Sequence, residues 1–449
     1  VKGFENVTVE IEIIPVADYV QKIMLMQTSG EKMDIIQTYL LDHASEYRNG
    51  SFMDITPYLE KYAKDVFEEV PEWVIEMGKV DGGQAILPLY QKMVNAPYYW
   101  TIPADLQEYL DVEAMQNSFF AERENGYIVS DTTKKVMEEY LEKVYADGKQ
   151  GKGYAGGAPL RGTDSIINNF RVYYEDPELK VFNAHLDAQQ QNIWRLKKYF
   201  YDKGYVRKDS LSAKAADFNG VKEGNLSWTS QNWTGKFEPY YNETLHDIPT
   251  LQIPVNDHFF APYKPAAGGF AVSIGSQYPD VAVKVIDLLN TKKGIELYNM
   301  LLYGFEGEHY EVVEVLEDGD KIIKPFEYAE EGTSACSYGL WKWIVGNAKY
   351  AWMTTYNNEG FKEIVYEYMN EGEDTIKSPL MGFALDSTSI ETKLSQVKAV
   401  SNEFGGPLGS GAVDTEKLLA EMTVKYEQAG NQEIVDEIQR QIDEFMQSK

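Results

Sequence analysis

The opening segment, residues 7–36, constrains the fold most, because it combines two secondary-structure periods. Residues 7–13 read Val-Thr-Val-Glu-Ile-Glu-Ile, a strict alternation that is typical of a half-buried strand. Residues 18–27 place Tyr19 and Ile23 on one helical face, and residues 34–36 form a short apolar run. A strand–helix–strand unit of this kind predicts a mainly parallel sheet with crossover helices, and therefore an α/β architecture.

The same alternation of helical and strand patterns continues along the chain. A chain of 449 residues is too long for one ordinary hydrophobic core, so we expect at least two lobes. The C-terminal pattern places Ile434, Ile438, Ile442 and Phe445 on one helical stripe. The sequence also predicts helices at 56–62, 132–145, 192–202 and 279–290, a turn and a short strand within 82–88, and a hairpin at 311–323.

The charge of the chain excludes some classes of partner. It carries 42 basic and 71 acidic side chains, a net charge of −29, and this field repels nucleic acid and anionic membrane surfaces. No apolar run approaches the roughly 20 residues that are needed to cross a bilayer. The single cysteine, Cys336, excludes an internal disulfide bond.

Motifs of catalysis and metal binding are mostly absent, so we predict no catalytic residue, no metal and no cofactor. The histidines (His43, His185, His246, His258 and His309) are far apart and form no metal-binding pair. Cys336 is interpreted as a small buried residue and not as a nucleophile. A pair of glycosidase carboxylates stays open as an alternative, because the sequence does not reveal which acids lie close together.

Three segments are dense in aromatic residues that alternate with amides or hydroxyls: 95–100, 225–233 and 338–343. A sugar requires this mixture, because its C–H faces stack on aromatic planes while its hydroxyls need hydrogen-bond partners. For any single residue, packing in a core is the better interpretation. The three segments together favour a binding site.

Trp228 and Trp233 are the principal candidates for ligand contact, with Asn232 beside them. Neutral hydrogen-bonding groups surround both indoles, and such groups match sugar hydroxyls without the desolvation of a charge. The odd spacing of the two tryptophans predicts that one stacks on ligand while the other can pack in the core. The further candidates are Tyr39, Tyr90, Trp100, Trp341 and Trp343.

Several segments, in order along nearly the whole chain, resemble the extracellular solute-binding proteins of carbohydrate ABC importers. Each segment is weakly specific by itself, and their order and spacing carry the resemblance. They are residues 19–34, 50–55, 80–88, 199–210, 268–274, 303–310, 343–347, 378–386 and 411–414. The family also has a strand, a helix and a lipid-bearing cysteine ahead of the position of Val1.

The resemblance implies a periplasmic-binding-protein-like fold of type II, with the ligand cleft between two α/β lobes that close on the ligand. We expect residues 1–102 and 265–346 in the first lobe. Residues 103–264 and 347–449 then form the second lobe, with a helical extension at the C-terminus.

The implied function is the substrate-binding component of an ABC importer, a monomer that captures an oligosaccharide and delivers it to the membrane permease subunits. The implied location is extracellular, as a cell-surface lipoprotein or in the periplasm. Two alternatives stay open: a carbohydrate-active enzyme (a glycosidase or lyase), and the same fold with a peptide-like solute. The low arginine content argues against the peptide-like solute.

Overall fold

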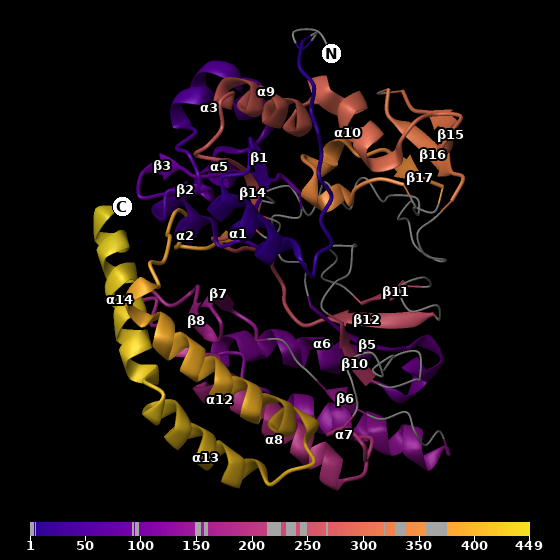
Figure 1. The fold of residues 1–449 in the computed structure, drawn as a ribbon. Coiled ribbons are helices and arrows are strands. Elements are labelled where there is room, and N and C mark those ends of the chain that lie inside the picture. Colours follow the sequence, from indigo (N-terminus) through magenta and orange to yellow (C-terminus); the bar gives the residue numbers. More distant parts are fainter. Residues whose placement is uncertain are drawn as a thin grey trace. The chain divides into compact units, whose positions relative to one another are not determined.

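The computed structural model divides into two compact units (Figure 1), each built from two separate stretches of chain. Unit 1 comprises Val1–Tyr90 and Lys264–Thr354, and unit 2 comprises Gln91–Tyr263 and Thr355–Lys449. Within the described part of the chain, no helix has both the length and the apolar character needed to span a membrane. The described residues are 4, 6–91, 94, 98–148, 154–156, 160–212, 226–229, 239–242, 249–265, 268–317, 319–327, 338–355 and 375–449; for 154–156, 226–229, 240 and 242 only the backbone is described.

These units differ from the expected lobes at three boundaries, of which the one at Lys264 shifts by a single residue. Residues 91–102 belong to unit 2, because β5 (Tyr99–Pro103) pairs with β12 (Thr250–Pro254) of that unit. Residues 347–354 belong to unit 1. The backbone N–H of Ala348 donates to the carbonyl of Tyr90 at 3.1 Å. The two larger shifts follow from backbone pairing between distant segments, which no local pattern specifies.

The sheet at the centre of unit 1 has the order β1-β14-β4, formed by Ile35–Gln37, Gly269–Val272 and Leu87–Pro88. Both pairings are antiparallel, so the prediction of a mainly parallel sheet is wrong for neighbouring strands. β1 and β4 do run parallel to each other. The returning strand β14 separates them and runs in the opposite direction.

Helices cover this sheet and end where sequence signals predict. α1 (Tyr19–Ser29) ends at Gly30, which has a φ of 71° in the left-handed region that favours glycine. α9 (Pro279–Asn290) begins with proline, as the sequence predicts, and buries one apolar face. The other elements of unit 1 are α2 (His43–Arg48), α3 (Thr56–Tyr62), α4 (Val66–Glu69), α5 (Glu72–Glu76), β2 (Lys79–Val80), β3 (Gly83–Gln84), η5 (Lys292–Gly294), α10 (Ile295–Tyr303), β15 (Tyr310–Val315), β16 (Lys321–Pro325), η6 (Lys342–Ile344), η7 (Ala348–Tyr350) and β17 (Met353–Thr354).

The prediction of a half-buried strand at residues 7–13 is wrong. This segment forms no strand pairing with any described residue, and its apolar side chains are exposed: Val9 by 53%, Ile11 by 51% and Ile13 by 70%. An alternating pattern becomes a strand only where a neighbouring strand takes up its backbone hydrogen bonds. The pattern is therefore correct for a strand, but the described residues supply no partner.

Unit 2 contains a mixed sheet of five strands in the order β11-β12-β5-β10-β6. All of its pairings are antiparallel except that of β10 with β6. Its remaining strands are β6 (Tyr154–Gly156), β10 (Leu226–Thr229) and β11 (Tyr240–Asn242). Helices α6 (Val112–Ala121), α7 (Asp131–Ala146) and α8 (Ala188–Asp202) contribute to the hydrophobic core beside this sheet, together with η1 (Ala104–Tyr109).

In unit 2, three C-terminal helices pack against the small antiparallel sheet β7-β8-β9 and form a second layer. The helices are α12 (Glu391–Ser410), α13 (Thr415–Gln428) and α14 (Asn431–Ser448). The predicted stripe on α14 is confirmed: Ile434, Ile438 and Ile442 are buried, and Phe445 packs against the same core. The other elements are η2 (Glu122–Asn125), β7 (Thr163–Ile167), β8 (Phe170–Tyr173), β9 (Phe182–Asn183), η3 (Ala184–Leu186), β13 (Phe260–Ala261), β18 (Ile376–Lys377) and η8 (Thr388–Ile390).

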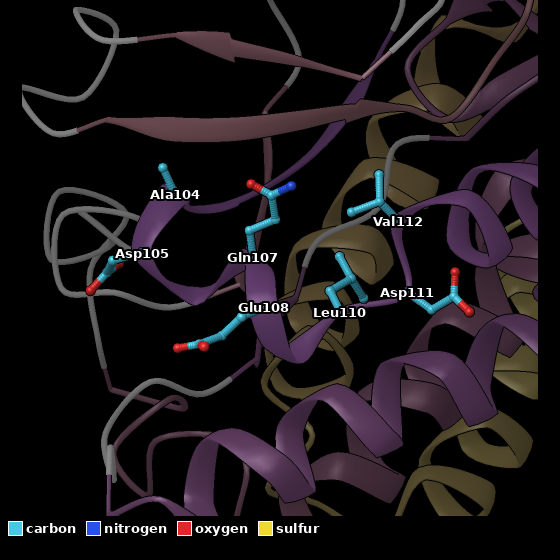
Figure 2. Close-up of a pocket in the computed structure, with 7 residues that line it drawn as sticks. All are labelled: Ala104, Asp105, Gln107, Glu108, Leu110, Asp111 and Val112. Atoms are coloured by element: carbon cyan, nitrogen blue, oxygen red, sulfur yellow. The ribbon is translucent and has the colours of Figure 1, made fainter.

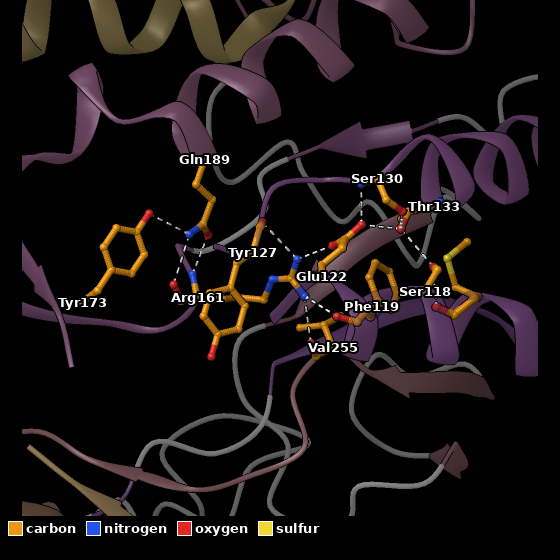
Figure 3. A network of polar contacts seen from close by, with 11 residues as sticks. Ser118, Phe119, Glu122, Tyr127, Ser130, Thr133, Arg161, Tyr173, Gln189 and Val255 are labelled. Carbon is orange, nitrogen blue, oxygen red and sulfur yellow. Dashed lines mark hydrogen bonds and ion pairs between the residues drawn. The ribbon is translucent and has the colours of Figure 1, made fainter. Parts of the chain in front are cut away.

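A buried ion pair between Arg161 and Glu122 ties several elements of unit 2 together (Figure 3). The guanidinium also donates to the carbonyls of Phe119 at 3.1 Å and Val255 at 2.9 Å. Glu122 in turn accepts from the backbone N–H of Ser130 at 2.7 Å. Because both charges are desolvated and each makes several hydrogen bonds, the loss of either partner leaves a buried charge without compensation.

We therefore predict that Glu122→Gln lowers the free energy of unfolding by about 3–5 kcal/mol, as is usual for breaking a buried pair. The control is Glu416→Gln, which breaks an exposed pair with Arg195 and is expected to cost less than about 1 kcal/mol. Denaturant unfolding of both variants measures the difference. Equal losses for the two variants would contradict the structural role of the buried pair.

A second prediction concerns Asp287 of α9, whose carboxylate accepts from the backbone N–H of Val66 at 3.1 Å. Burial, with nearby Asp65, raises the pKa of Asp287 to about 6. The folded protein therefore binds this proton more tightly than the unfolded chain, and stability falls as the pH rises from about 4 through 6.

Asp287→Asn removes this penalty and retains an acceptor for Val66. We expect the variant to be more stable than the wild type by about 2–3 kcal/mol at pH 8, and nearly unchanged at pH 4. Thermal melting across this pH range measures the difference, with the exposed Asp280→Asn as the control. If Asp287→Asn brings no gain in stability at pH 8, the acid carries no penalty and the prediction is wrong.

Candidate functional site

Two loops of unit 1 meet at one edge of its central sheet. Because β1 and β4 both run antiparallel to β14, their carboxyl ends lie at the same edge, beside the start of β14. Tyr39 follows β1, and Tyr90 follows β4. Ligands of open α/β sheets bind outside the carboxyl ends of strands, so the fold places these tyrosines where a ligand is expected.

The unit 1 aromatic pair, Tyr39 and Trp341, lies at this edge. Their ring centroids are 6.2 Å apart in an edge-to-face arrangement with an interplanar angle of 71°. Tyr39 is 41% exposed and Trp341 is 52% exposed, so both rings offer a face to solvent. Two large rings in contact with each other and exposed in this way form a ready surface for the apolar face of a ligand.

The side chains of Thr38 and Gln37 accept hydrogen bonds from backbone N–H groups and so hold the Tyr39 loop in place. The hydroxyl of Thr38 accepts from the N–H of Gly269 at 2.8 Å, which ties the loop to β14. The side-chain oxygen of Gln37 accepts from the N–H of Tyr39 at 2.6 Å. These bonds fix the direction in which the chain leaves β1, and therefore the position of the Tyr39 ring.

A glycine positions the segment that carries Trp341. Gly339 has a φ of 102°, and a Cβ atom at this position would lie 2.0 Å from the carbonyl oxygen of Leu302. No other residue fits there without movement of α10. The N–H of Leu340 also donates to the carbonyl of Leu301 at 2.9 Å. Trp341 is the next residue after this anchored turn.

Tyr90 and Trp343 lie in neighbouring elements but are buried. Tyr90 is 6% exposed and Trp343 is 8% exposed. The carbonyl of Tyr90 accepts from Ala348, which follows Trp343 closely in the chain. Of the predicted residues in unit 1, the structure therefore brings Tyr39 and Trp341 into exposed contact, while Tyr90 and Trp343 support the elements beside them.

Of the predicted contact residues in unit 2, the structure describes the side chain of Trp100 and the backbone of Trp228. Trp100 is fully buried and packs edge-to-face against Phe119 at 6.0 Å and Tyr140 at 6.3 Å, which favours a core role. The backbone of Trp228 pairs directly with that of Trp100 in the sheet. Trp233 and Asn232 lie outside the described residues, so their roles and that of Trp228 stay predictions.

Three further ring-bearing side chains of unit 1, those of Phe305, His309 and Tyr338, were not selected from the sequence as ligand contacts. Tyr338 packs on His309 with 4.2 Å between the ring centroids, and Phe305 lies 6.1 Å from the same histidine. The N–H of Phe305 donates to Nδ1 of His309 at 3.0 Å. Phe305 and His309 lie in residues 303–310, which resembled the family without the alternation of aromatics and amides. Tyr338 instead begins the aromatic segment 338–343 that the sequence did indicate.

A separate groove of about 550 Å³ lies in unit 2, along η1 and the start of α6 (Figure 2). Carboxylates of Asp105, Glu108 and Asp111 line it, and the side chain of Asp111 caps α6 through the N–H of Ala114 at 2.9 Å. Among the described residues, no group of three or more His, Cys, Asp and Glu side chains is placed to hold a metal ion. The groove offers no aromatic plane, and we assign no ligand to it.

Comparison with known proteins finds relatives over nearly the whole chain. A carbohydrate ABC transporter substrate-binding protein of Streptococcus pneumoniae serotype 4 is 22% identical over 453 residues, which cover 98% of this chain and 85% of that protein. Residues 379–447 match the family described as "Domain of unknown function (DUF3502)". This match spans helices α12 to α14, the helical layer of unit 2.

Solved structures of similar fold are solute-binding proteins. The N-glycan transport solute binding protein NgtS from Streptococcus pneumoniae has a TM-score of 0.75 at 19% identity, over 98% of this chain and 92% of that chain. The same protein in complex with Man5GlcNAc has a TM-score of 0.65 at 19% identity, with the same coverage of 98% and 92%. The substrate binding protein FusA of S. pneumoniae in complex with kestose has a TM-score of 0.59 at 13% identity, over 96% and 92%.

This likeness confirms the predicted fold class, the two-lobed architecture of solute-binding proteins. It also confirms the resemblance that the ordered sequence segments indicated. Each unit is built from two separate stretches of chain, as that architecture requires.

The contrast between exposed and buried tryptophans predicts different effects on stability. Trp341→Ala is expected to change the free energy of unfolding by less than about 1 kcal/mol, because half of the ring is already in water. Trp100→Ala is expected to cost about 3–5 kcal/mol, because it empties a core position. Denaturant unfolding measures both, and a large loss for Trp341→Ala would contradict a surface role.

Proposed function

We propose that this protein is the substrate-binding component of a carbohydrate ABC importer and that it captures an oligosaccharide. The observation that carries the proposal is the unit 1 aromatic pair, exposed at the carboxyl ends of β1 and β4 in a fold that matches solute-binding proteins. Aromatic planes take the apolar faces of sugar rings, and the hydroxyls of the ring are left for polar partners.

The comparisons support a sugar as the solute. The relative that covers 98% of the chain is named as a carbohydrate transporter component. Neighbours of the same fold are seen with Man5GlcNAc and with kestose, both oligosaccharides. The relatives are binding proteins and not enzymes, so we propose that this protein, too, binds its sugar without chemistry.

The remaining parts of the site follow from the same proposal. Trp228, Trp233 and Asn232 are proposed to supply ligand contacts from unit 2, and ligand is proposed to draw the two units together by a hinge motion. The proposed partners are the permease subunits of the importer. The proposed location is the outer side of the cell membrane, with the protein working as a monomer.

The test is an array of oligosaccharides followed by calorimetry on those that bind. Trp341→Ala and Tyr39→Ala are each expected to weaken binding about 10-fold or more, which corresponds to about 1.4 kcal/mol. Phe326→Ala is the matched control, because Phe326 is also an exposed aromatic residue of unit 1, at 54%. Full affinity in both site variants would refute the assigned site.

A second measurement separates a binding protein from a carbohydrate-active enzyme. The bound oligosaccharide is recovered after prolonged incubation and analysed by mass spectrometry. An unchanged mass and composition is the expected result, because a binding protein returns its ligand intact. Shortened or unsaturated products would favour the glycosidase or lyase alternative.

A further inference from the structure

Arg171 of β8 differs from the other arginines of the chain because no carboxylate of a described residue forms an ion pair with it. Among the described residues, only the hydroxyl of Thr163 accepts a hydrogen bond from it, at 3.3 Å, and its Nε is buried without a partner. The remaining arginines each form an ion pair with Asp or Glu: Arg48, Arg123, Arg161, Arg195, Arg207 and Arg440. In a chain with 71 acidic and 42 basic side chains, an arginine without a carboxylate is unexpected.

The contrast with Arg161 in the same unit shows what Arg171 lacks. Arg161 is buried and binds the carboxylate of Glu122 and several backbone carbonyls. Arg171 is half-buried, and its burial lowers its pKa because the attraction of Tyr98 and Asp164 does not offset the loss of water. A guanidinium has five donors, so Arg171 keeps most of its hydrogen-bonding capacity for another partner.

The position of Arg171 in the sheet places it on the side away from the core. Phe170 and Val172 of β8 are buried in the core formed with the C-terminal helices, and side chains alternate along a strand. Asp164 pairs with Val172 and so lies on that core side, where its carboxylate accepts from the N–H of Tyr263 at 3.2 Å. Asp164, the acid that attracts Arg171, is therefore also bound to the backbone of Tyr263.

The residues that share the side of Arg171 suit a sugar. We call this surface the arginine face; it comprises Thr163, Ser165, Arg171, Tyr173 and Phe182. Tyr173 and Phe182 stack with 4.8 Å between their centroids and an interplanar angle of 20°. The face thus combines a cation, three hydroxyls and an aromatic stack on one small sheet, and the Tyr173 hydroxyl donates to the carboxylate of Asp187 at 2.9 Å.

We propose that the arginine face is a ligand subsite, and that Arg171 binds the carboxylate of an acidic sugar unit such as a uronic or sialic acid. A planar guanidinium binds a carboxylate through two parallel hydrogen bonds, a geometry that a neutral hydroxyl cannot match. The net charge of −29 repels an anionic solute at long range, so a local cation is needed for one to bind. The inference rests on the proposed function and specifies its substrate class.

The test compares a uronate trisaccharide with a neutral trisaccharide of the same linkage by calorimetry, at low and at high salt. The wild type is expected to bind the acidic sugar about 10-fold more tightly than the neutral one, with a preference that shrinks as salt rises. Arg171→Gln is expected to lose about 10- to 100-fold in affinity for the acidic sugar, and less than about 3-fold for the neutral one. Arg171→Lys should restore only part of the loss, because lysine keeps the charge without the two-pronged geometry.

Arg195→Gln is the matched control, since it removes an exposed and ion-paired arginine of the same unit. Arg171→Gln should also melt at or above the wild-type temperature, because it breaks no ion pair with a described residue. Equal affinity of the wild type for both sugars, an equal loss for both in Arg171→Gln, or a markedly lower melting temperature would each overturn the inference. If no oligosaccharide binds at all, the proposed function fails together with it, whereas binding of neutral sugars without preference overturns this inference alone.

Discussion

The close passage of β14 between β1 and β4 is the constraint on which the candidate site depends. A Cβ atom at Gly269 would lie 2.3 Å from the carbonyl oxygen of Leu87, and one at Gly268 would lie 2.7 Å from the backbone of Thr38. Glycine at both positions lets the returning strand start between the two loops. That arrangement puts the carboxyl ends of β1 and β4 at one edge and brings Tyr39 to Trp341. The position of the proposed sugar-binding site thus depends on Gly268 and Gly269, which have no side chains.

In unit 2, the central constraint is the burial of charged side chains. Arg161 lies deep in the unit and is fully compensated by Glu122 and by carbonyls (Figure 3), so it acts as a structural tie. Arg171 lies half-buried on a sheet face, where no described residue supplies a carboxylate ion pair to it. The helical layer that matches the domain of unknown function covers the opposite face of that sheet. One physical role of this domain is therefore to complete the core against which the arginine face is built.

Local periodicity predicted the helices well and the sheets poorly. The helices at 56–62 and 279–290 were predicted at the bounds they have, because amphipathic spacing and an initial proline are properties of the segment itself. The pairing of β1 with β14 joins residues more than two hundred positions apart, and residues 7–13 carry a strand pattern without a described partner. The sequence selected Tyr39 and Trp341 as candidate aromatic contacts, but it also selected Trp100, which is in the core. The face of a sheet that a residue occupies depends on packing that no short segment encodes. Arg171 was missed because its significance is the absence of a carboxylate partner among the described residues.

The central claim is that an oligosaccharide is held on the unit 1 aromatic pair. The most direct measurement is a crystal structure of the protein with an oligosaccharide selected from an array. The account predicts a pyranose ring that stacks on the indole of Trp341 at van der Waals distance, with Tyr39 at its edge. A bound sugar that leaves Trp341 and Tyr39 in solvent, or one that occupies the acidic groove along η1, would contradict it.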